Sequence, residues 1–344
     1  MDSPVTRKEL RTPNELRIAF FISSYRSPLP LIRLVKTLRL SEPDSPIVIL
    51  RNSFESHLDS SSFAFIPNVH ILTSEAPILW GDLSLDVARW RVFRWILGNL
   101  DVDWVVLLSE QDYPISSSDR LRTLLADSGA DALIGGRRVD EIEDKKTRRK
   151  FVDRYFYQYT CLPSVNIAHR FPRAGRQFAT LIRRGMFFCI NHSQRFIFIS
   201  MRPEELQLPS WFGWRARKTP FREGFPCWHH HPWYAISRKA IRHVLDYVSA
   251  HPDVVRYYAR TVIPLESVTG TIIFNDPELE VANIGLHETR WADPDSPRPG
   301  VFTLEDLPHL RRSAAVFARK FDEESSDVLD ELDKVVLGGS RSTL

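Results

Sequence analysis

Short apolar runs and helical patterns alternate along the first half of the chain. The apolar runs that predict strands cover residues 17–22, 47–50, 69–72, 104–108 and 132–134. Amphipathic helical spacing occurs between them, over residues 31–38, 85–95 and 121–125. Trp104 to Leu108 is continuously apolar, which is typical of a strand that is covered on both faces. The alternation predicts an α/β fold with a mostly parallel central sheet flanked by helices.

The second half is less regular. Residues 203–233 are rich in Pro, Trp, Arg and His, which predicts a long excursion over one face of the sheet. Residues 137–150 carry charges of both signs and predict a solvated loop or helix, with an acceptor-binding role as the alternative. Helical patterns return over residues 241–248, 266–274, 304–312 and 322–336, so we expect a C-terminal helical extension. We predict one domain over residues 17–336, with flexible ends at 1–16 and 337–344.

Composition narrows the class of protein. The chain has 344 residues, of which 43% are hydrophobic and 26% charged, so it can form a sizeable core. Lys plus Arg number 46 and Asp plus Glu 43, a balance that argues against a nucleic-acid partner. No run of about 18 apolar residues occurs, so no integral membrane segment is predicted.

The cysteines and the N-terminal residues indicate in which cellular compartment the protein is expected. Cys161, Cys189 and Cys227 are widely spaced and odd in number, which favours buried free thiols in a reducing compartment. Residues 1–17 lack the apolar core of a signal peptide. We therefore expect a soluble, cytoplasmic protein.

Several catalytic motifs are absent from the sequence. It contains no glycine-rich phosphate loop of either usual type, no GxSxG elbow, no CxxC pair and no HExxH motif. The triplet His229-His230-His231 is a weak candidate for a metal site, because adjacent side chains point apart on a strand or helix. A loop beside a binding cleft is the favoured interpretation of the triplet.

Polar residues follow the predicted strands at the edge where a parallel sheet binds ligands. Ser23 and Asn52 come after the first two strands and are candidates to contact a nucleotide. Glu110 and Asp112 follow strand 104–108, where two carboxylates could hold Mg²⁺ or Mn²⁺ bridging a diphosphate. The alternative is a turn in which Asp112 accepts hydrogen bonds from backbone amides.

Five strings then occur in order along the chain. They are WGDLSL at 80–85, DWVVLLSEQDYP at 103–114, WYAISRKA at 233–240, PLES at 264–267 and FARKFD at 317–322. Together they resemble the signatures of the core-2/I-branching β-1,6-N-acetylglucosaminyltransferase and peptide O-xylosyltransferase family, here as a soluble, bacterial-type member. The resemblance implies a GT-A-like fold and an inverting transfer of a sugar from a UDP-sugar to an acceptor hydroxyl. UDP-N-acetylglucosamine is the first candidate donor.

The resemblance also assigns roles to residues. Glu266 matches the catalytic general base, although Leu265 stands where the family usually has Asp. Lys320 matches the lysine that neutralises the leaving diphosphate, Arg298 is the nearest candidate for the partner arginine, and Arg319 is a further candidate. The alternatives are purely structural roles. Glu266 would be a carboxylate favoured at the start of a helix, and Arg319 and Lys320 would cover an apolar helix face with their side-chain stems.

The implied chemistry needs no tightly bound cofactor and no divalent metal, with the pair Glu110 and Asp112 as the metal-dependent alternative. Asp112 is also counted among the donor-binding candidates. Trp291 matches a family tryptophan beside the acceptor, and Trp233 opens another matched string, so both are candidate acceptor contacts. A buried core position is the alternative for Trp291.

The acceptor and the exact activity stay open. His231-Pro232 replaces the Gly-Ser that the family has before Trp233, so the acceptor could be a glycan, a peptide or a small metabolite. A UDP-xylose-dependent O-xylosyltransferase is the alternative enzyme. A catalytically silent sugar-binding protein is the alternative from another class.

Overall fold

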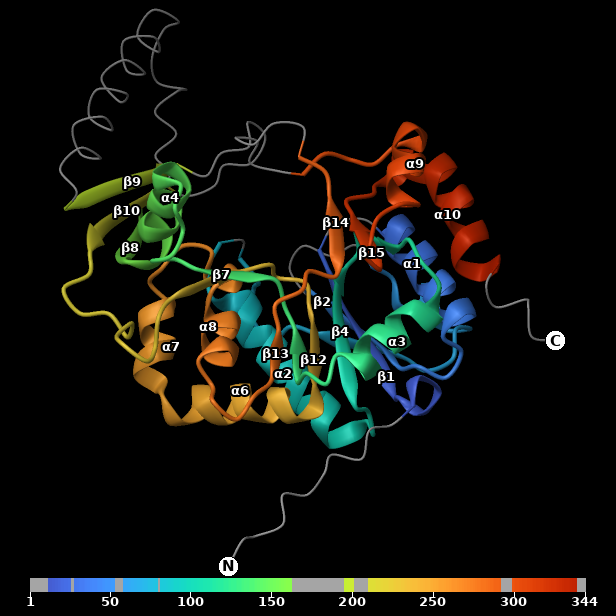
Figure 1. Ribbon diagram of the computed structural model, residues 1–344, viewed down its shortest axis with the longest axis horizontal. Coiled ribbons are helices and arrows are strands. Elements are labelled where there is room, and N and C mark those ends of the chain that lie inside the picture. The colour runs from blue at the N-terminus through green and yellow to red at the C-terminus, as the bar shows by residue number, and fades with distance from the viewer. Residues whose placement is uncertain are drawn as a thin grey trace, which may run out of the picture.

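A seven-stranded sheet forms the centre of the computed structural model (Figure 1). The structure describes residues 12–25, 28–52, 58–79, 81–162, 195–200, 210–291 and 299–338. The strand order is β13-β6-β12-β4-β1-β2-β3, and only β12 runs antiparallel to its neighbours. These strands are β1 (Ile18–Ser24), β2 (Ile47–Arg51), β3 (Val69–Thr73), β4 (Trp104–Ser109), β6 (Ala132–Leu133), β12 (Ala235–Ser237) and β13 (Val281–Ala282).

Helices cover both faces of this sheet, as the alternating pattern predicts. They are α1 (Pro28–Ser41), α2 (Ser84–Asn99), α3 (Ser118–Asp127), α6 (Arg238–Ala250), α7 (Pro252–Tyr258), α8 (Val268–Phe274), α9 (Leu307–Leu310) and α10 (Ser326–Gly338). Helix α4 (Lys145–Tyr155) packs in a separate cluster with Val139, Ile142 and Cys227. Ser237 caps α6 by accepting a hydrogen bond from the Ala240 amide. The expected mostly parallel α/β architecture is confirmed.

The two apolar faces of the strands separate the core into two layers. On β1, Phe20 and Ile22 pack in the layer with α1 and α10, whereas Ala19 and Phe21 pack in the layer with α2, α6 and α8. Successive strand residues point to opposite faces, so a strand covered on both faces must be apolar throughout. Strand β4 follows the same rule, which confirms the interpretation of its continuous apolar run.

Short strands outside the main sheet form three smaller sheets. They are β5 (Asp112–Pro114), β7 (Gly136–Arg138), β8 (Tyr157–Leu162), β9 (Phe196–Ser200), β10 (Ser210–Arg215), β11 (Trp228–His230), β14 (His287–Thr289) and β15 (Phe317–Arg319). β14, β15 and β5 form one sheet, β8, β10 and β9 another, and β11 pairs with β7. Segment 137–150 contains the end of β7 and the start of α4, in line with the predicted loop or helix. The described part of segment 203–233, residues 210–233, contains β10 and β11 and is more regular than its sequence pattern indicates.

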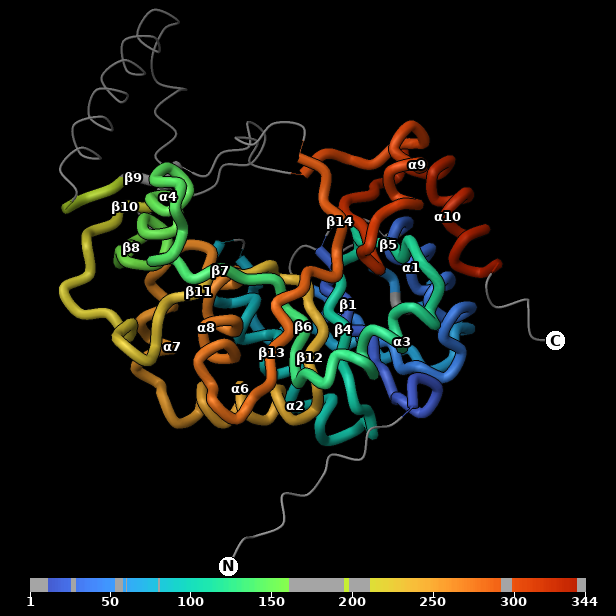
Figure 2. Tube along the Cα trace, in the orientation of Figure 1, coloured from blue at the N-terminus to red at the C-terminus, as the bar shows by residue number. Residues whose placement is uncertain are grey.

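The C-terminal extension returns to the N-terminal half of the chain. Figure 2 shows α10, in red, beside α1, in blue. Arg33 of α1 forms ion pairs with Asp330 at 2.6 Å and Asp333 at 2.7 Å, and the Asp333 carboxylate also accepts a 3.0 Å hydrogen bond from Thr37. The predicted helical extension is therefore a layer of the core and closes one face of the sheet.

The cysteine and membrane predictions can be checked only over part of the chain. Cys227 is a free, buried thiol, and burial raises its pKa to about 12. Cys189 lies outside the described residues. Within the described ranges, no helix has the length and apolar character needed to cross a bilayer.

A buried ion pair ties the start of the domain to α3. Arg122 donates to Glu42 Oε1 at 2.7 Å and to the Leu16 carbonyl at 2.9 Å, and the Glu42 side chain is only 3% exposed.

Replacing Arg122 with Ala leaves that carboxylate buried without its cation, so we expect the free energy of unfolding to fall by about 3 kcal/mol. Urea denaturation measures the change. Arg311→Ala is the control, because its pair with Glu331 is half-exposed and should contribute under about 1 kcal/mol; equal losses in the two variants would contradict the prediction.

Candidate functional site

The carboxyl ends of three neighbouring parallel strands meet at one edge of the main sheet. Ser23 of β1 lies opposite Leu50 of β2 and Ser109 of β4. Asn52 follows β2 and is buried, with its side-chain amide paired to the backbone of Ile78 at 3.2 and 3.3 Å. The structure thus brings Ser23 and Asn52 to the predicted ligand-binding edge.

The two carboxylates that follow β4 are engaged in different contacts. Glu110 Oε2 accepts hydrogen bonds from the Ser24 hydroxyl at 2.8 Å and the Tyr25 amide at 3.0 Å. Asp112 accepts from the amide of Ser109 at 2.7 Å and from its hydroxyl at 2.8 Å. Among the described residues, no group of three or more His, Cys, Asp and Glu side chains is arranged to hold a metal ion.

Asp112 is also the centre of a buried charged cluster. Pairing of β5 with β15 places Arg319 opposite Asp112, with Nη1 3.6 Å from Oδ1, and His287 Nε2 lies 3.3 Å from Oδ2. Burial acts to raise the pKa of Asp112, but the charges of Arg319 and His287 outweigh it and lower that pKa. Asp112 therefore stays ionised and balances the positive charge of Arg319.

Lys320 follows β15 directly, and its backbone is fixed on both sides. Its carbonyl accepts a 3.0 Å hydrogen bond from the Phe302 amide, and the next amide, of Phe321, donates to the Gln111 carbonyl at 2.9 Å. The strings that contain Asp112 and Lys320 thus meet through backbone pairing. The backbone of these two basic residues, Arg319 and Lys320, therefore lies beside the segment that follows β4.

Glu266 lies at the end of a short 3-10 helix (Pro264–Glu266) that precedes α8. Ile263, just before it, has φ 53°, a left-handed conformation that a β-branched residue seldom adopts. The Ile263 amide donates to the Gly81 carbonyl at 2.8 Å, and the Glu266 amide donates to the Ile263 carbonyl at 3.2 Å. Strained backbone of this kind persists where surrounding structure fixes it, and here it fixes the position of Glu266.

The Glu266 carboxylate is anchored through one oxygen. Arg154 of α4 donates to Oε2 at 2.6 Å, and His229 Nδ1 lies 3.9 Å from the same atom. Burial acts to lower the pKa of Arg154, but the charge of Glu266 outweighs it and raises that pKa. The side chain of Glu266 is 28% exposed. Its other oxygen, Oε1, has no hydrogen-bond partner among the described residues.

The histidine triplet lies beside Glu266 and consists of neutral side chains. His229 stacks on Phe151 with ring centroids 3.8 Å apart, and its Nδ1 lies 3.1 Å from the Tyr155 hydroxyl, which in turn donates to the Glu266 carbonyl at 3.3 Å. Burial, followed by the charge of Arg154, lowers the pKa of His229 well below its usual range. The triplet is thus a packing element next to Glu266. His229 and His230 lie in β11, so the prediction of a loop was wrong for these two residues.

Burial also gives His230 a pH-dependent effect on stability. Its pKa is lowered to about 3, mainly by desolvation. An unfolded histidine takes up a proton near pH 6.5, so the stabilising contribution of neutral His230 is complete above pH 6.5 and is lost as the pH falls towards 3. We expect the burial of neutral His230 to lower the free energy of unfolding by about 1.4 kcal/mol for each pH unit below pH 6.

Denaturation of wild type and His230→Gln between pH 7 and pH 4 tests this expectation. The variant should lose stability less steeply than wild type. His309→Gln is the control, because the His309 side chain is 59% exposed. Parallel stability curves for wild type and His230→Gln would contradict the prediction.

The segment from β11 to β12 connects Glu266 with the basic cluster. His229 is at one end, beside Glu266, and Trp233 is near the other, with the Arg319 guanidinium over its ring. Between them, burial lowers the pKa of His231, while the charge of Glu266 raises it and that of Arg319 lowers it further. His231 therefore interacts electrostatically with Glu266 and with Arg319, the two predicted site residues at the ends of this segment.

The two predicted acceptor tryptophans differ in exposure. Trp291 is 51% exposed, so the core alternative does not describe it, whereas Trp233 is 9% exposed. Arg298, the candidate partner of Lys320, lies outside the described residues, as does Trp80. The roles of these residues toward a substrate stay predictions.

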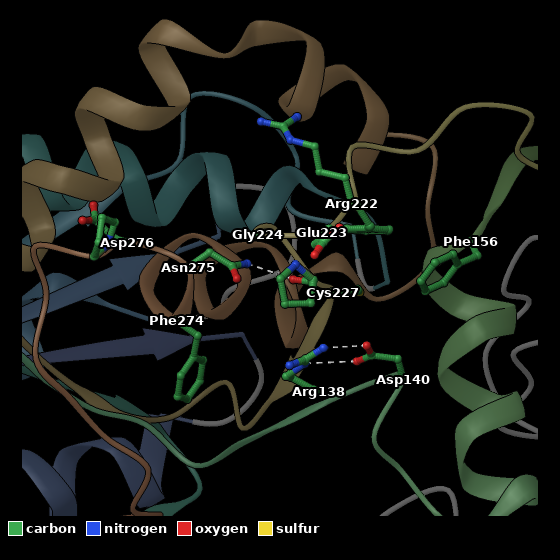
Figure 3. Close-up of a pocket in the computed structure, with 13 residues that line it drawn as sticks. Arg138, Asp140, Phe156, Arg222, Glu223, Gly224, Cys227, Phe274, Asn275 and Asp276 are labelled. Carbon is green, nitrogen blue, oxygen red and sulfur yellow. Dashed lines mark hydrogen bonds and ion pairs between the residues drawn. The ribbon is translucent and has the colours of Figure 1, made fainter.

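A pocket of about 770 Å³ is lined by Cys227 and Phe274, among other residues (Figure 3). It contains none of the predicted site residues, and Arg138 and Asp140 form an ion pair at its side. The Cys227 thiol also lies 3.6 Å from the hydroxyl of Ser267, the residue after Glu266.

Two basic residues of the site were not predicted from the sequence. Arg154 lies in α4, just after the charged segment 137–150, and its contact with Glu266 depends on tertiary packing. Arg89 is 2% exposed and lies four residues after Leu85 on the apolar face of α2. A charge on an apolar helix face is a signal that could have identified Arg89.

Comparison with known proteins places the chain in a family. The family model of the Core-2/I-Branching enzyme matches residues 18–209, more than half of the chain. Two curated relatives from Arabidopsis thaliana, beta-glucuronosyltransferases GlcAT14A and GlcAT14B, are 28% and 29% identical over 127 residues, which is 36% of this chain.

These matches span less than a third of the relatives' own length, 28% and 29%. A solved structure, A197 from STIV, is 19% identical over 36% of this chain and 47% of that chain, with a TM-score of 0.22, which is too low to place the fold. The family match, in contrast, covers β1, β2 and β4, whose ends form the ligand-binding edge. The protein belongs to the Core-2/I-branching enzyme family of glycosyltransferases, with the GT-A-like fold that the sequence resemblance implies.

Proposed function

We propose that this glycosyltransferase transfers a sugar from a UDP-sugar to an acceptor hydroxyl with inversion, and that Glu266 is the general base. One observation supports the proposal: Arg154 holds the carboxylate at Oε2, while Oε1 has no hydrogen bond with a described residue and the side chain is partly exposed. A general base must lie within hydrogen-bonding reach of the proton that it removes.

The reaction is a single displacement. Glu266 takes the proton of the acceptor hydroxyl as that oxygen attacks the anomeric carbon from the face opposite UDP. The bond from the anomeric carbon to the phosphate oxygen breaks, and its electron pair stays on the leaving diphosphate. This geometry inverts the configuration at the anomeric carbon.

The charge that develops on UDP needs neighbouring cations. Arg319 and Lys320 are the basic residues of the family string at 317–322, and Arg298 completes the proposed set. Preorganised charges aimed at the leaving group stabilise the transition state without reorganising during the reaction. We propose that they do so without a divalent ion. The alternative assigns that work to a metal held by Glu110 and Asp112.

The donor sugar is a choice among three candidates. UDP-N-acetylglucosamine remains the first, and UDP-xylose is the alternative that the sequence resemblance suggests. The names of the two Arabidopsis relatives add UDP-glucuronic acid. The acceptor is a glycan, a peptide or a small metabolite with a free hydroxyl.

UDP release across these three donors, each with and without EDTA, tests the proposal. Slow hydrolysis of the donor replaces the unidentified acceptor. Release from one donor that survives EDTA supports the proposed enzyme and identifies its sugar. No release from any donor, together with no binding of UDP, would overturn the proposal, whereas binding without release would favour a silent sugar-binding protein.

A further inference from the structure

Two guanidinium groups lie over the single indole ring of Trp233. Cζ of Arg89 is 4.7 Å from the ring centroid, and Cζ of Arg319 is 4.8 Å from it. The three residues come from α2, from the segment before β12 and from β15, so packing of distant parts of the chain creates this arrangement. An indole ring attracts a cation over its face, and the attraction is strongest where water is excluded.

Arg89 is buried to an unusual degree for a charged residue. It is 2% exposed, and its only hydrogen bond among the described residues runs from Nη1 to the Pro232 carbonyl at 3.0 Å. That carbonyl belongs to the residue immediately before Trp233. Arg89 therefore fixes both the backbone and the ring of the same short segment. Asp86, buried one turn earlier in α2, is the nearby counter-charge.

Arg319 has a second partner besides the ring. Asp112 lies 3.6 Å from its Nη1, too far for a hydrogen bond, and Nη1 is a buried donor without a hydrogen-bond acceptor in the described ranges. A guanidinium that contacts a ring face and a carboxylate 3.6 Å away still has N–H groups that can donate to a further acceptor. Phosphate oxygens suit such donors, because they accept charge-assisted hydrogen bonds from arginine.

We propose that Trp233 and Arg89 are positioning residues that hold the Arg319 guanidinium toward the leaving diphosphate. This inference rests on the proposed function. It gives Trp233 a different role from the acceptor contact predicted from the sequence: its ring is occupied by the two cations. Arg319 is the only one of the three that touches the substrate.

Binding of UDP and of uridine to four proteins tests this role. The proteins are wild type, Trp233→Leu, Arg319→Met and the double variant, and calorimetry gives each dissociation constant. We expect Trp233→Leu to weaken UDP binding about tenfold, the range of a desolvated cation–π contact, and to leave uridine binding within about twofold. In the double variant the two losses should overlap, because Trp233 acts through Arg319.

Further variants separate positioning from general damage to the fold. Trp233→Phe keeps an aromatic face and should retain most of the UDP affinity. Arg89→Met should weaken UDP binding in the same direction as Trp233→Leu, and it supplies the test if Trp233→Leu does not fold. Trp214→Leu is the matched control, because Arg260 lies 5.2 Å over the Trp214 ring, away from β15; its UDP affinity should equal that of wild type.

Three results would overturn the inference alone. The first is wild-type UDP affinity in Trp233→Leu and Arg89→Met. The second is additive losses in the double variant, and the third is an equal loss of uridine affinity; either would show that Trp233 does not act through Arg319. Failure of wild type to bind UDP at all would instead overturn the proposed function, and this inference with it.

Discussion

Replacing Glu266 with Gln is expected to lower kcat for sugar transfer by about 10²–10⁴-fold, the usual contribution of a general base. Gln has the same shape and can still accept a hydrogen bond from Arg154 through its carbonyl oxygen. It cannot take up the proton of the acceptor hydroxyl. The dissociation constant of UDP should stay within about twofold, because the base faces the acceptor and not the leaving group.

The measurement is UDP release with saturating donor and acceptor, or donor hydrolysis where no acceptor has been identified. Glu278→Gln is the matched control, since the Glu278 side chain is 74% exposed and lies near the end of α8. It should keep wild-type activity. A Glu266→Gln protein that transfers sugar at the wild-type rate would remove Glu266 from the mechanism, whatever the activity of the control.

The sheet was predictable because the sequence pattern of each strand and helix depends only on neighbouring residues. Alternation of strand and helix patterns requires only the periodicity of neighbouring residues, and a strand apolar at every position, such as 104–108, must be covered on both faces. The positions of Ser23 and Asn52 followed from the same logic, since residues after parallel strands meet at one edge. What the pattern did not contain was the pairing of three-residue strands such as β5 and β15.

The partners of the site residues were less predictable than the residues themselves. Glu266 stood in a recognisable string, but Arg154 is 112 residues away from it, on a helix whose charges looked solvated. Asp112 and Arg319 meet only because β15 pairs with β5. Arg89 was the exception, because a charge on the apolar face of α2 carries its own signal. Contacts between distant segments depend on tertiary packing, which a single sequence does not display.

Replacing Lys320 with Met is expected to lower kcat by about 10²–10³-fold, the range found when one preorganised donor to a developing charge is removed. The cation compensates the negative charge that UDP acquires as the bond to the anomeric carbon breaks. UDP binding should weaken as well, whereas uridine, which has no phosphate, should bind as it does to wild type. Lys334→Met is the matched control, because the Lys334 side chain is 69% exposed on α10.

The same assay decides between basic side chains and a metal ion. If Lys320 and Arg319 neutralise the leaving diphosphate, EDTA leaves UDP release by wild type unchanged. Mn²⁺ then does not restore UDP release by the Lys320→Met variant. If a metal neutralises the diphosphate, EDTA abolishes wild-type release, Mn²⁺ restores it, and Asp112→Asn loses that rescue. The second result is structurally demanding, because Glu110 Oε2 would have to leave Ser24 and Tyr25, and Asp112 would have to leave Ser109. Those existing hydrogen bonds are the physical reason to expect the first.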